Sequence, residues 1–194
     1  FGHRGHVQTA FRTRQQIGST GKLFVLVAAY EYGISPNREF PSRSLDGRGW
    51  PAEPSRLCKG RDMTLTEALT HSCNRPFTWA AYELAHRLTT VVDRFELRPP
   101  DAPALVPLGG IETSPLRLAR AYAAVANKGR LPRIRSLIAA LGRRGNVLYA
   151  PASYSEAVMS PEIALRVRQA LRSPVEAGTA RLADSSHAIV YGKT

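Results

Sequence analysis

A serine and a lysine three residues apart, Ser19 and Lys22, are the first side chains in this sequence whose spacing allows chemistry. Gly18 ends the segment that precedes this pair. From Leu23 onward, apolar residues recur at three- and four-residue spacing, which predicts a helix from near Ser19 to near Gly33. Both side chains would then share the first helical turn. A hydroxyl beside an amine at the positive end of a helix dipole can be an activated nucleophile. The plainer alternative is a capping serine with a solvated lysine.

A second candidate pair is Ser72 and Asn74. Residues 64–67 read Thr-Leu-Thr-Glu, a capping box that begins a short helix, and Pro76 suits the first turn of the next helix. Ser72 and Asn74 therefore fall in the tight turn between two helices, with their side chains projecting the same way if the turn is extended. Because such residues are also common turn formers, the pair alone indicates no function.

The third pair, Lys193 and Thr194, follows the short apolar run 187–191, which predicts a strand. A second lysine matters because Lys22 can act as a base only when it is neutral, against an ordinary pKa of about 10.4. Burial and a nearby cation both lower the pKa of an amine. The three pairs occur in the order Ser-x-x-Lys, Ser-x-Asn, Lys-Thr, and this ordered set carries more information than any one pair alone.

This ordered set resembles the penicillin-binding transpeptidase family, the acyl-serine enzymes related to serine β-lactamases. The residues between the motifs are similar as well, so the resemblance covers nearly the whole chain from about residue 11 onward. The similar stretches are residues 15–20, 65–69, 107–112, 121–123, 126–129 and 178–180.

The resemblance implies an α+β fold, the α/β/α sandwich of the β-lactamase and transpeptidase type. This chain would carry mainly the helical part plus a sheet strand at its end, with the sheet incomplete. Residues 1–194 would be a partial transpeptidase domain of the high-molecular-mass type, with the bifunctional class A among the candidates. The flanking strands, a membrane anchor and any glycosyltransferase domain are expected outside these residues.

The resemblance implies that the three pairs meet in one site, and it gives four of their residues catalytic roles. Ser19 would attack a peptide carbonyl while Lys22 takes its proton. Ser72 would relay a proton to the leaving amine, and Asn74 would orient Lys22 and the substrate backbone. The implied activity is a D,D-transpeptidase that cross-links peptidoglycan stem peptides through an acyl-serine intermediate and is inhibited covalently by β-lactams. A D,D-carboxypeptidase, or a catalytically impaired sensor of the same fold, is the alternative, since carboxypeptidase and transpeptidase differ only in what attacks the acyl-enzyme.

Lys193 and Thr194 are the implied substrate-binding residues, for the carboxylate of the peptide or of a β-lactam. In the family, the oxyanion hole combines the N–H of the serine with one from the strand just after Lys-Thr-Gly. Gly21 and Leu23 depart from the family pattern, which has a bulkier residue and a proline there, and this predicts a looser first turn. No metal and no other cofactor is implied. The implied location is the periplasmic or extracytoplasmic face of the bacterial inner membrane, with other cell-wall synthesis proteins as further partners.

The sequence argues against three other assignments: a nucleic-acid-binding protein, a P-loop nucleotide-binding protein and a membrane-spanning segment. The net charge of +12 comes from 23 Arg and 4 Lys and favours anionic partners. The arginines are nevertheless scattered, without a basic helix or an aromatic-interleaved patch, so we expect no specific nucleic-acid role. A P-loop is excluded because Gln16 and Leu23 stand where its first Gly and its Ser or Thr belong. The longest apolar run, residues 23–30, is eight residues long, whereas a membrane span needs about 20.

The two cysteines, Cys58 and Cys73, fit neither a metal-ligand cluster nor a Cys-x-x-Cys redox pair. The sequence is compatible both with one disulfide between them and with two buried, unpaired thiols. We predict unpaired thiols, with the Cys73 side chain turned away from the site into the helical packing. His3 and His6, near the basic N-terminus, are assigned no role.

The remaining sequence predicts mostly helices joined by loops. Further helices are expected over residues 64–69, 76–86, 115–126 and 161–171. A hairpin is expected from 134–141 and 147–149, and long loops over 35–60, 98–107 and 173–180.

Overall fold

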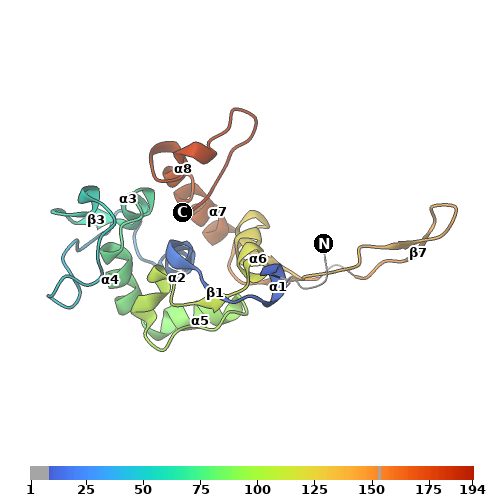
Figure 1. The fold of residues 1–194 in the computed structure, drawn as a ribbon, viewed down its shortest axis with the longest axis horizontal. Coiled ribbons are helices and arrows are strands. Elements are labelled where there is room, and N and C mark those ends of the chain that lie inside the picture. Colours follow the sequence, from blue (N-terminus) through green and yellow to red (C-terminus); the bar gives the residue numbers. More distant parts are fainter. Residues whose placement is uncertain (1–8, 153) are drawn as a thin grey trace.

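A single buried helix, α2 (Lys22–Glu31), is the centre of the molecule (Figure 1). The computed structural model describes residues 9–152 and 154–194, so His3 and His6 lie outside the described part. Every residue from 22 to 30 is buried, so α2 is enclosed on all sides rather than on one face. The elements that pack against it are α4 (Arg75–Leu84), α5 (His86–Arg94), α7 (Pro161–Ala170) and the 3-10 helix η3 (Pro103–Leu108).

The 3-10 turn η1 (Gly18–Gly21) leads directly into α2, so Ser19 lies just before the helix as predicted. The expected looseness of this turn is not found. Gly21 and Leu23 are both buried, and a Cβ added to Gly21 would lie 2.1 Å from the carbonyl oxygen of Val106 in η3. Glycine at this position therefore lets the backbone of η3 pack closely against the first turn.

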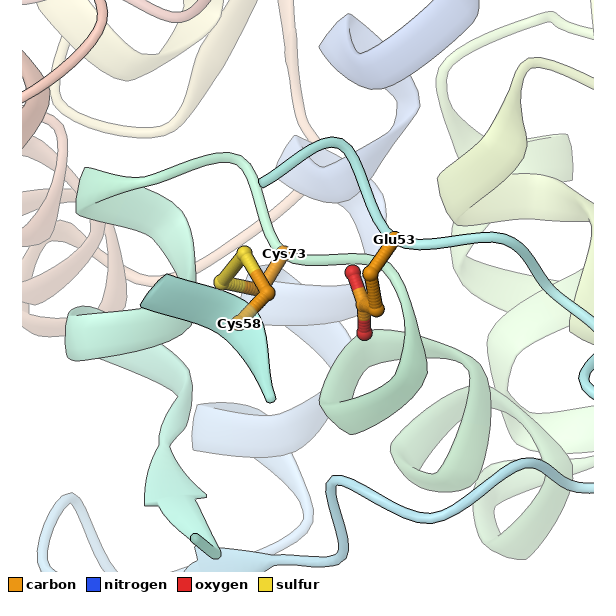
Figure 2. A group of neighbouring side chains, drawn as sticks. All are labelled: Glu53, Cys58 and Cys73. Atoms are coloured by element: carbon orange, nitrogen blue, oxygen red, sulfur yellow. A yellow bond between two sulfur atoms is a disulfide. The ribbon is translucent and has the colours of Figure 1, made fainter. Parts of the chain in front are cut away.

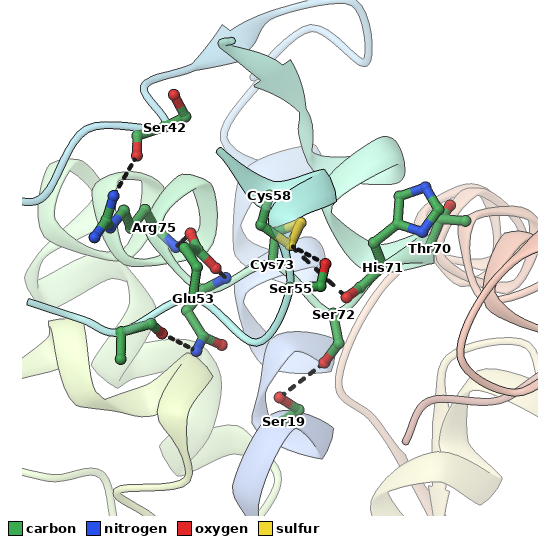
Figure 3. Close-up of a disulfide and its surroundings, with 12 residues drawn as sticks. Ser19, Ser42, Glu53, Ser55, Cys58, Thr70, His71, Ser72, Cys73 and Arg75 are labelled. Carbon is green, nitrogen blue, oxygen red and sulfur yellow. Dashed lines mark hydrogen bonds between the residues drawn. A yellow bond between two sulfur atoms is a disulfide. The ribbon is translucent and has the colours of Figure 1, made fainter. Parts of the chain in front are cut away.

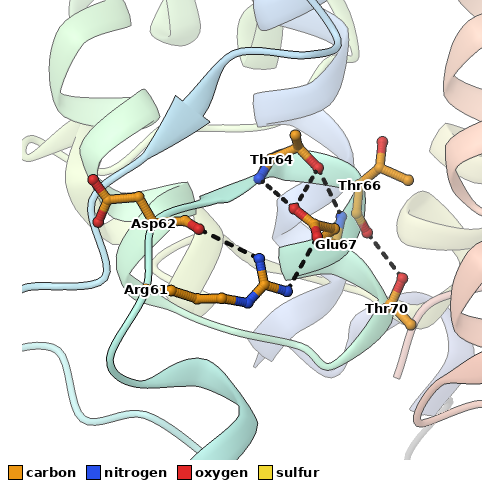
Figure 4. Close-up of polar contacts among 6 residues, drawn as sticks. All are labelled: Arg61, Asp62, Thr64, Thr66, Glu67 and Thr70. Atoms are coloured by element: carbon orange, nitrogen blue, oxygen red, sulfur yellow. Dashed lines mark hydrogen bonds and ion pairs between the residues drawn. The ribbon is translucent and has the colours of Figure 1, made fainter.

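The short helix α3 (Leu65–Thr70) begins with the predicted capping box. The Thr64 side chain accepts a hydrogen bond from the Glu67 backbone N–H, and the Glu67 carboxylate accepts one from the Thr64 backbone N–H (Figure 4). Arg61 donates to the same carboxylate at 3.1 Å. These contacts satisfy two free N–H groups at the start of α3, those of Thr64 and Glu67, and so stabilise the helix that leads to Ser72.

The helices expected after the second motif are mostly confirmed. Ser114 caps α6 (Pro115–Ala126) and Ser160 caps α7, each with a proline in the first turn. One predicted end is wrong: α4 stops at Leu84, because Ala85 has φ +44° and turns the chain into α5. The other short helices are α1 (Thr9–Arg12), α8 (Ser173–Ala177), η2 (Arg56–Cys58) and η4 (Arg181–Ala183).

The strands form four separate antiparallel pairs, and the described residues contain no larger or closed sheet. The predicted hairpin is present as β6 and β7, which extend away from the helices as a long arm (Figure 1). The pairs are β1 (Gln15–Gln16) with β4 (Glu112–Thr113), β2 (Glu39–Phe40) with β3 (Met63–Thr64), β5 (Arg130–Pro132) with β8 (Ser155–Ala157), and β6 (Ala140–Leu141) with β7 (Val147–Tyr149). The fold is thus α+β with mainly its helical part present.

The strand predicted over residues 187–191 is not formed. The segment forms no strand ladder; among its contacts the Arg172 side chain donates to the Val190 carbonyl at 3.1 Å and the Gly192 N–H donates to the Leu171 carbonyl at 3.0 Å. Its apolar side chains predict a strand, but strand formation depends on a paired neighbour. None of the described helices combines the length and apolar character that a membrane crossing requires.

The prediction of unpaired cysteines is wrong, because Cys58 and Cys73 form a disulfide. Their Cα atoms lie 5.2 Å apart, since η2 brings the loop that precedes α3 back against the turn that follows it. The expected direction of Cys73 is correct: its side chain is fully buried, while its neighbours Ser72 and Asn74 face Ser19 and Lys22. The spacing of the cysteines carries no signal for this pairing, because the pairing depends on how the loop returns.

We predict that the disulfide contributes about 3 kcal/mol to the free energy of unfolding, as expected for a cross-link that spans 15 residues. Replacing both cysteines together, by Cys58→Ser and Cys73→Ser, should lower this free energy by about that amount in urea unfolding. The double replacement avoids leaving a lone reactive thiol. The unreduced wild-type protein, once unfolded, should titrate with no free thiol, and two free thiols would contradict the pairing.

Candidate active site

Ser19 and Lys22 are in direct contact at the start of α2. The Lys22 Nζ atom donates to Ser19 Oγ at 2.7 Å, because three residues of helical turn bring both side chains to one side. Lys22 is fully buried, and its amine lies 5.8 Å from the centre of the Phe77 ring. The alternative of a solvated lysine is therefore wrong.

Asn74 and Ser72 reach this pair from the turn between α3 and α4. Lys22 Nζ donates to Asn74 Oδ1 at 2.8 Å, and Ser72 Oγ donates to Ser19 Oγ at 3.1 Å. Ser72 adopts φ +60°, a left-handed conformation that a serine rarely adopts, and the turn is fixed by the disulfide of Cys73 (Figure 3). The predicted common direction of the two side chains is confirmed.

Lys193 completes the group from the other end of the sequence. Its Nζ donates to Ser72 Oγ at 2.8 Å, and it also contacts the Thr194 carbonyl oxygen. The hydroxyls of Thr194 and Thr179 lie 2.6 Å apart, which ties this segment to the loop after α8. The predicted approach of Lys193 to Ser19 is thus found, through Ser72, although no strand carries it.

The six residues predicted from the sequence therefore meet in one polar cluster. A continuous chain of hydrogen bonds runs from Lys193 through Ser72 and Ser19 to Lys22, and ends at Asn74. Thr194 lies at its edge, where its carbonyl oxygen is 3.5 Å from Ser72 Oγ. Such a chain can move a proton from one side of Ser19 to the other.

Burial changes the charge state of both lysines. Loss of hydration and the nearby cation Lys193 lower the pKa of Lys22 to about 7, while Glu53 acts in the opposite direction. Loss of hydration likewise lowers the pKa of Lys193 to about 8. A large fraction of Lys22 is therefore neutral at neutral pH and able to accept a proton, while most of Lys193 keeps its charge.

The residues that hold Asn74 in place were not predicted from the sequence. The two carboxylate oxygens of Glu53 accept hydrogen bonds from the backbone N–H groups of Asn74 and Arg75, at 2.6 and 2.7 Å. The Ala52 carbonyl accepts from Asn74 Nδ2 at 2.7 Å. The sequence signal for these contacts is weak: it consists of one acidic residue between Pro51 and Pro54, in a stretch predicted to be a loop.

Glu53 also lies beside the disulfide, with its carboxylate and both sulfur atoms within 4.8 Å of one another (Figure 2). Carboxylate and thiolate are metal ligands in general. Here the two sulfur atoms are bonded to each other, and both carboxylate oxygens already accept backbone hydrogen bonds. The group therefore acts as a clamp on the Ser72–Asn74 turn.

Known proteins are similar to this chain in sequence and in fold. The family described as the penicillin binding protein transpeptidase domain matches residues 6–98 and 104–194. Penicillin-binding protein 1A of Rickettsia felis is 33% identical over 146 residues, which is 70% of this chain and 18% of that protein. The chain therefore spans less than one fifth of the length of that relative.

Two solved structures are similar in fold. Penicillin-binding protein A of Mycobacterium tuberculosis, solved as an imipenem acyl-enzyme complex, aligns with a TM-score of 0.77 and 19% identity, over 88% of this chain and 46% of that one. The D,D-transpeptidase domain of a peptidoglycan glycosyltransferase from Eggerthella lenta aligns with a TM-score of 0.78 and 18% identity, over 96% of this chain and 55% of that one. With the family match covering nearly all of its residues, the chain belongs to the penicillin-binding protein transpeptidase family.

Proposed function

We propose that this chain supplies the acyl-serine site of a peptidoglycan D,D-transpeptidase, with Ser19 as the nucleophile. The observation that supports it best is the hydrogen-bonded chain from Lys193 to Asn74, which joins three segments of the sequence around one serine hydroxyl. The Rickettsia relative is named as a penicillin-binding protein, and the Eggerthella structure is described as a D,D-transpeptidase domain.

In the proposed first step, Ser19 Oγ attacks the carbonyl carbon of the penultimate residue of a stem peptide. Neutral Lys22, 2.7 Å away, takes the hydroxyl proton as the new C–O bond forms. The N–H of Ser19 donates to the developing oxyanion, together with a second donor expected just after Thr194. When the C–N bond breaks, the proton passes through Ser72 to the leaving amine, and an ester on Ser19 remains.

In the second step, the amine of another stem peptide attacks this ester. The same groups work in reverse: the incoming amine loses a proton through Ser72 or Lys22, and Ser19 recovers its own as the ester bond breaks. A β-lactam would follow only the first step, because its leaving amine stays attached after the ring opens and occupies the site.

Lys193 and Thr194 are proposed to bind the carboxylate of the substrate or of the β-lactam. Lys193 keeps most of its charge below its pKa of about 8, so it can pair with a carboxylate in the site. A groove of about 390 Å³ opens beside Ser72, between the loop before α3 and α8, and includes His71 and Thr179 in its walls. We propose that the stem peptides enter along this groove.

We propose that the domain acts outside the cytoplasm. The Cys58–Cys73 disulfide supports this location, because disulfides persist in oxidising compartments such as the periplasm. Residues 1–194 would then be part of a transpeptidase domain in a longer, membrane-anchored protein that works with other cell-wall synthesis proteins.

The first prediction from this site is a covalent penicillin adduct at Ser19. Intact-mass spectrometry after incubation with penicillin should show one added β-lactam, because the ester cannot be released by an incoming amine. The adduct should be absent in Ser19→Ala. An adduct of the same mass in that variant would show that another residue is the nucleophile.

The second prediction concerns pH. The second-order rate of acylation by a fluorescent penicillin should rise as pH passes about 7, where Lys22 loses its proton, and fall above about 8, where Lys193 loses its charge. The two midpoints belong to the coupled pair of amines. Lys22→Arg keeps a cation but no accessible base, so it should acylate about 10²–10⁴-fold more slowly. A wild-type rate that is flat between about pH 5 and 10 would contradict the role of Lys22.

A further inference from the structure

Glu53 binds the part of the chain that carries the catalytic asparagine. Its carboxylate accepts from the first two N–H groups at the start of α4, those of Asn74 and Arg75, at 2.6 and 2.7 Å. A carboxylate is favoured at this end of a helix, because the free N–H groups carry partial positive charge there. Glu53 is half-buried, so these charge-assisted bonds are partly shielded from water.

The loop around Glu53 also sets which way the Asn74 amide points. The neighbouring Ala52 carbonyl can only accept, so it takes Nδ2 of Asn74 at 2.7 Å and leaves Oδ1 toward Lys22 at 2.8 Å. If the loop moved, this amide would be free to rotate, and the contact with the base would be lost.

The same loop is held in the other direction by the Arg75 side chain. Its guanidinium donates to the carbonyls of Ser42, Gly49 and Pro51, each at 3.0 Å, and Figure 3 shows the contact with Ser42. Backbone and side-chain contacts thus run both ways between the loop and the start of α4. This reciprocal arrangement makes Glu53 part of a rigid unit.

Given the proposed acyl-serine function, we propose that Glu53 is a positioning residue for acylation: it holds Asn74 against Lys22 and places a negative charge beside this base. Removing it would act on the reaction in two separable ways, through geometry and through charge. No contact between Glu53 and the reacting atoms is required.

The charge effect has a defined sign. Lys22 faces the cation Lys193 and the carboxylate of Glu53, and the guanidinium of Arg75 is held by the carbonyls of the loop. Burial and Lys193 lower the pKa of Lys22, and Glu53 raises it. Without the charge of Glu53 the pKa of Lys22 falls further, so the base becomes neutral at lower pH. It also becomes a weaker base, because basicity falls with the pKa.

The test compares Glu53→Gln with Glu53→Asp in the same protein. Glu53→Gln removes the charge and replaces one acceptor oxygen by a donor that faces a backbone N–H. Acylation by the fluorescent penicillin should slow by roughly 10- to 100-fold, as expected for a slightly misplaced catalytic group. The lower midpoint of its pH profile should move to a lower pH than in the wild type. Glu53→Asp keeps the charge but shortens the reach, so it should slow acylation while the midpoint stays near that of the wild type.

The matched control is Glu83→Gln, which removes a carboxylate that α4 itself carries, away from Asn74 and Lys22. Glu83 is exposed and pairs with Arg38 at 2.7 Å. The Glu83→Gln substitution should leave both the acylation rate and the lower midpoint of the pH profile unchanged.

Hydrogen exchange gives a second readout that does not need acylation. The backbone amides of Asn74 and Arg75 should exchange faster in Glu53→Gln, because each loses or weakens its carboxylate acceptor. If Glu53→Gln acylates at the wild-type rate, keeps the wild-type midpoint, or leaves these amides fully protected, the inference is overturned. A wild-type protein that forms no adduct at all overturns the proposed function instead, while the exchange result still decides whether Glu53 holds the turn.

Discussion

The burial of one amine, that of Lys22, is the constraint on which the rest of the site depends. An ammonium group loses its hydration inside a protein, so it either becomes neutral or is paired. Lys22 begins a helix that is enclosed on all sides, and its pKa falls to about 7. Its amine still needs hydrogen-bond partners, and the nearest are Ser19 from its own helical turn and Asn74 from another segment. Burial thus favours the neutral form of the Lys22 amine and fixes where its hydrogen-bond partners must lie.

The groups that surround the buried Lys22 amine come from segments that are distant in sequence. Asn74 can reach Lys22 only because α4 starts next to α2, and this start is held by Glu53 and by the disulfide between Cys58 and Cys73. Lys193 approaches from the end of the described chain and contributes the second cation that lowers the pKa of Lys22. The loop of residues 42–58 contains little regular structure, yet it holds the turn that carries Ser72 and Asn74. It does so through the Glu53 carboxylate and through the disulfide from Cys58.

The sequence predicted the site better than it predicted the framework. Ser19 and Lys22 share a helical turn and Ser72 and Asn74 share a short interhelical turn, so local spacing was sufficient to place each pair. The contacts between the pairs were expected only because the ordered set of motifs resembles that of a known family. The disulfide, the clamp by Glu53 and the start of α5 at His86 were not predictable in this way, since each depends on how the chain returns to itself. The strand over residues 187–191 was predicted from apolar side chains alone, but a strand also needs a partner.

The most direct test of the central claim is the protonation of Lys22 itself. The chain has only four lysines, so NMR of protein labelled at the lysine side-chain nitrogen should resolve each amine, with Lys22→Arg assigning the signal. We expect the Lys22 amine to titrate with a midpoint of about 7, because burial and Lys193 both disfavour its charged form. A midpoint near the ordinary value of about 10.4 would show that Lys22 remains an ammonium at neutral pH and cannot take the proton of Ser19.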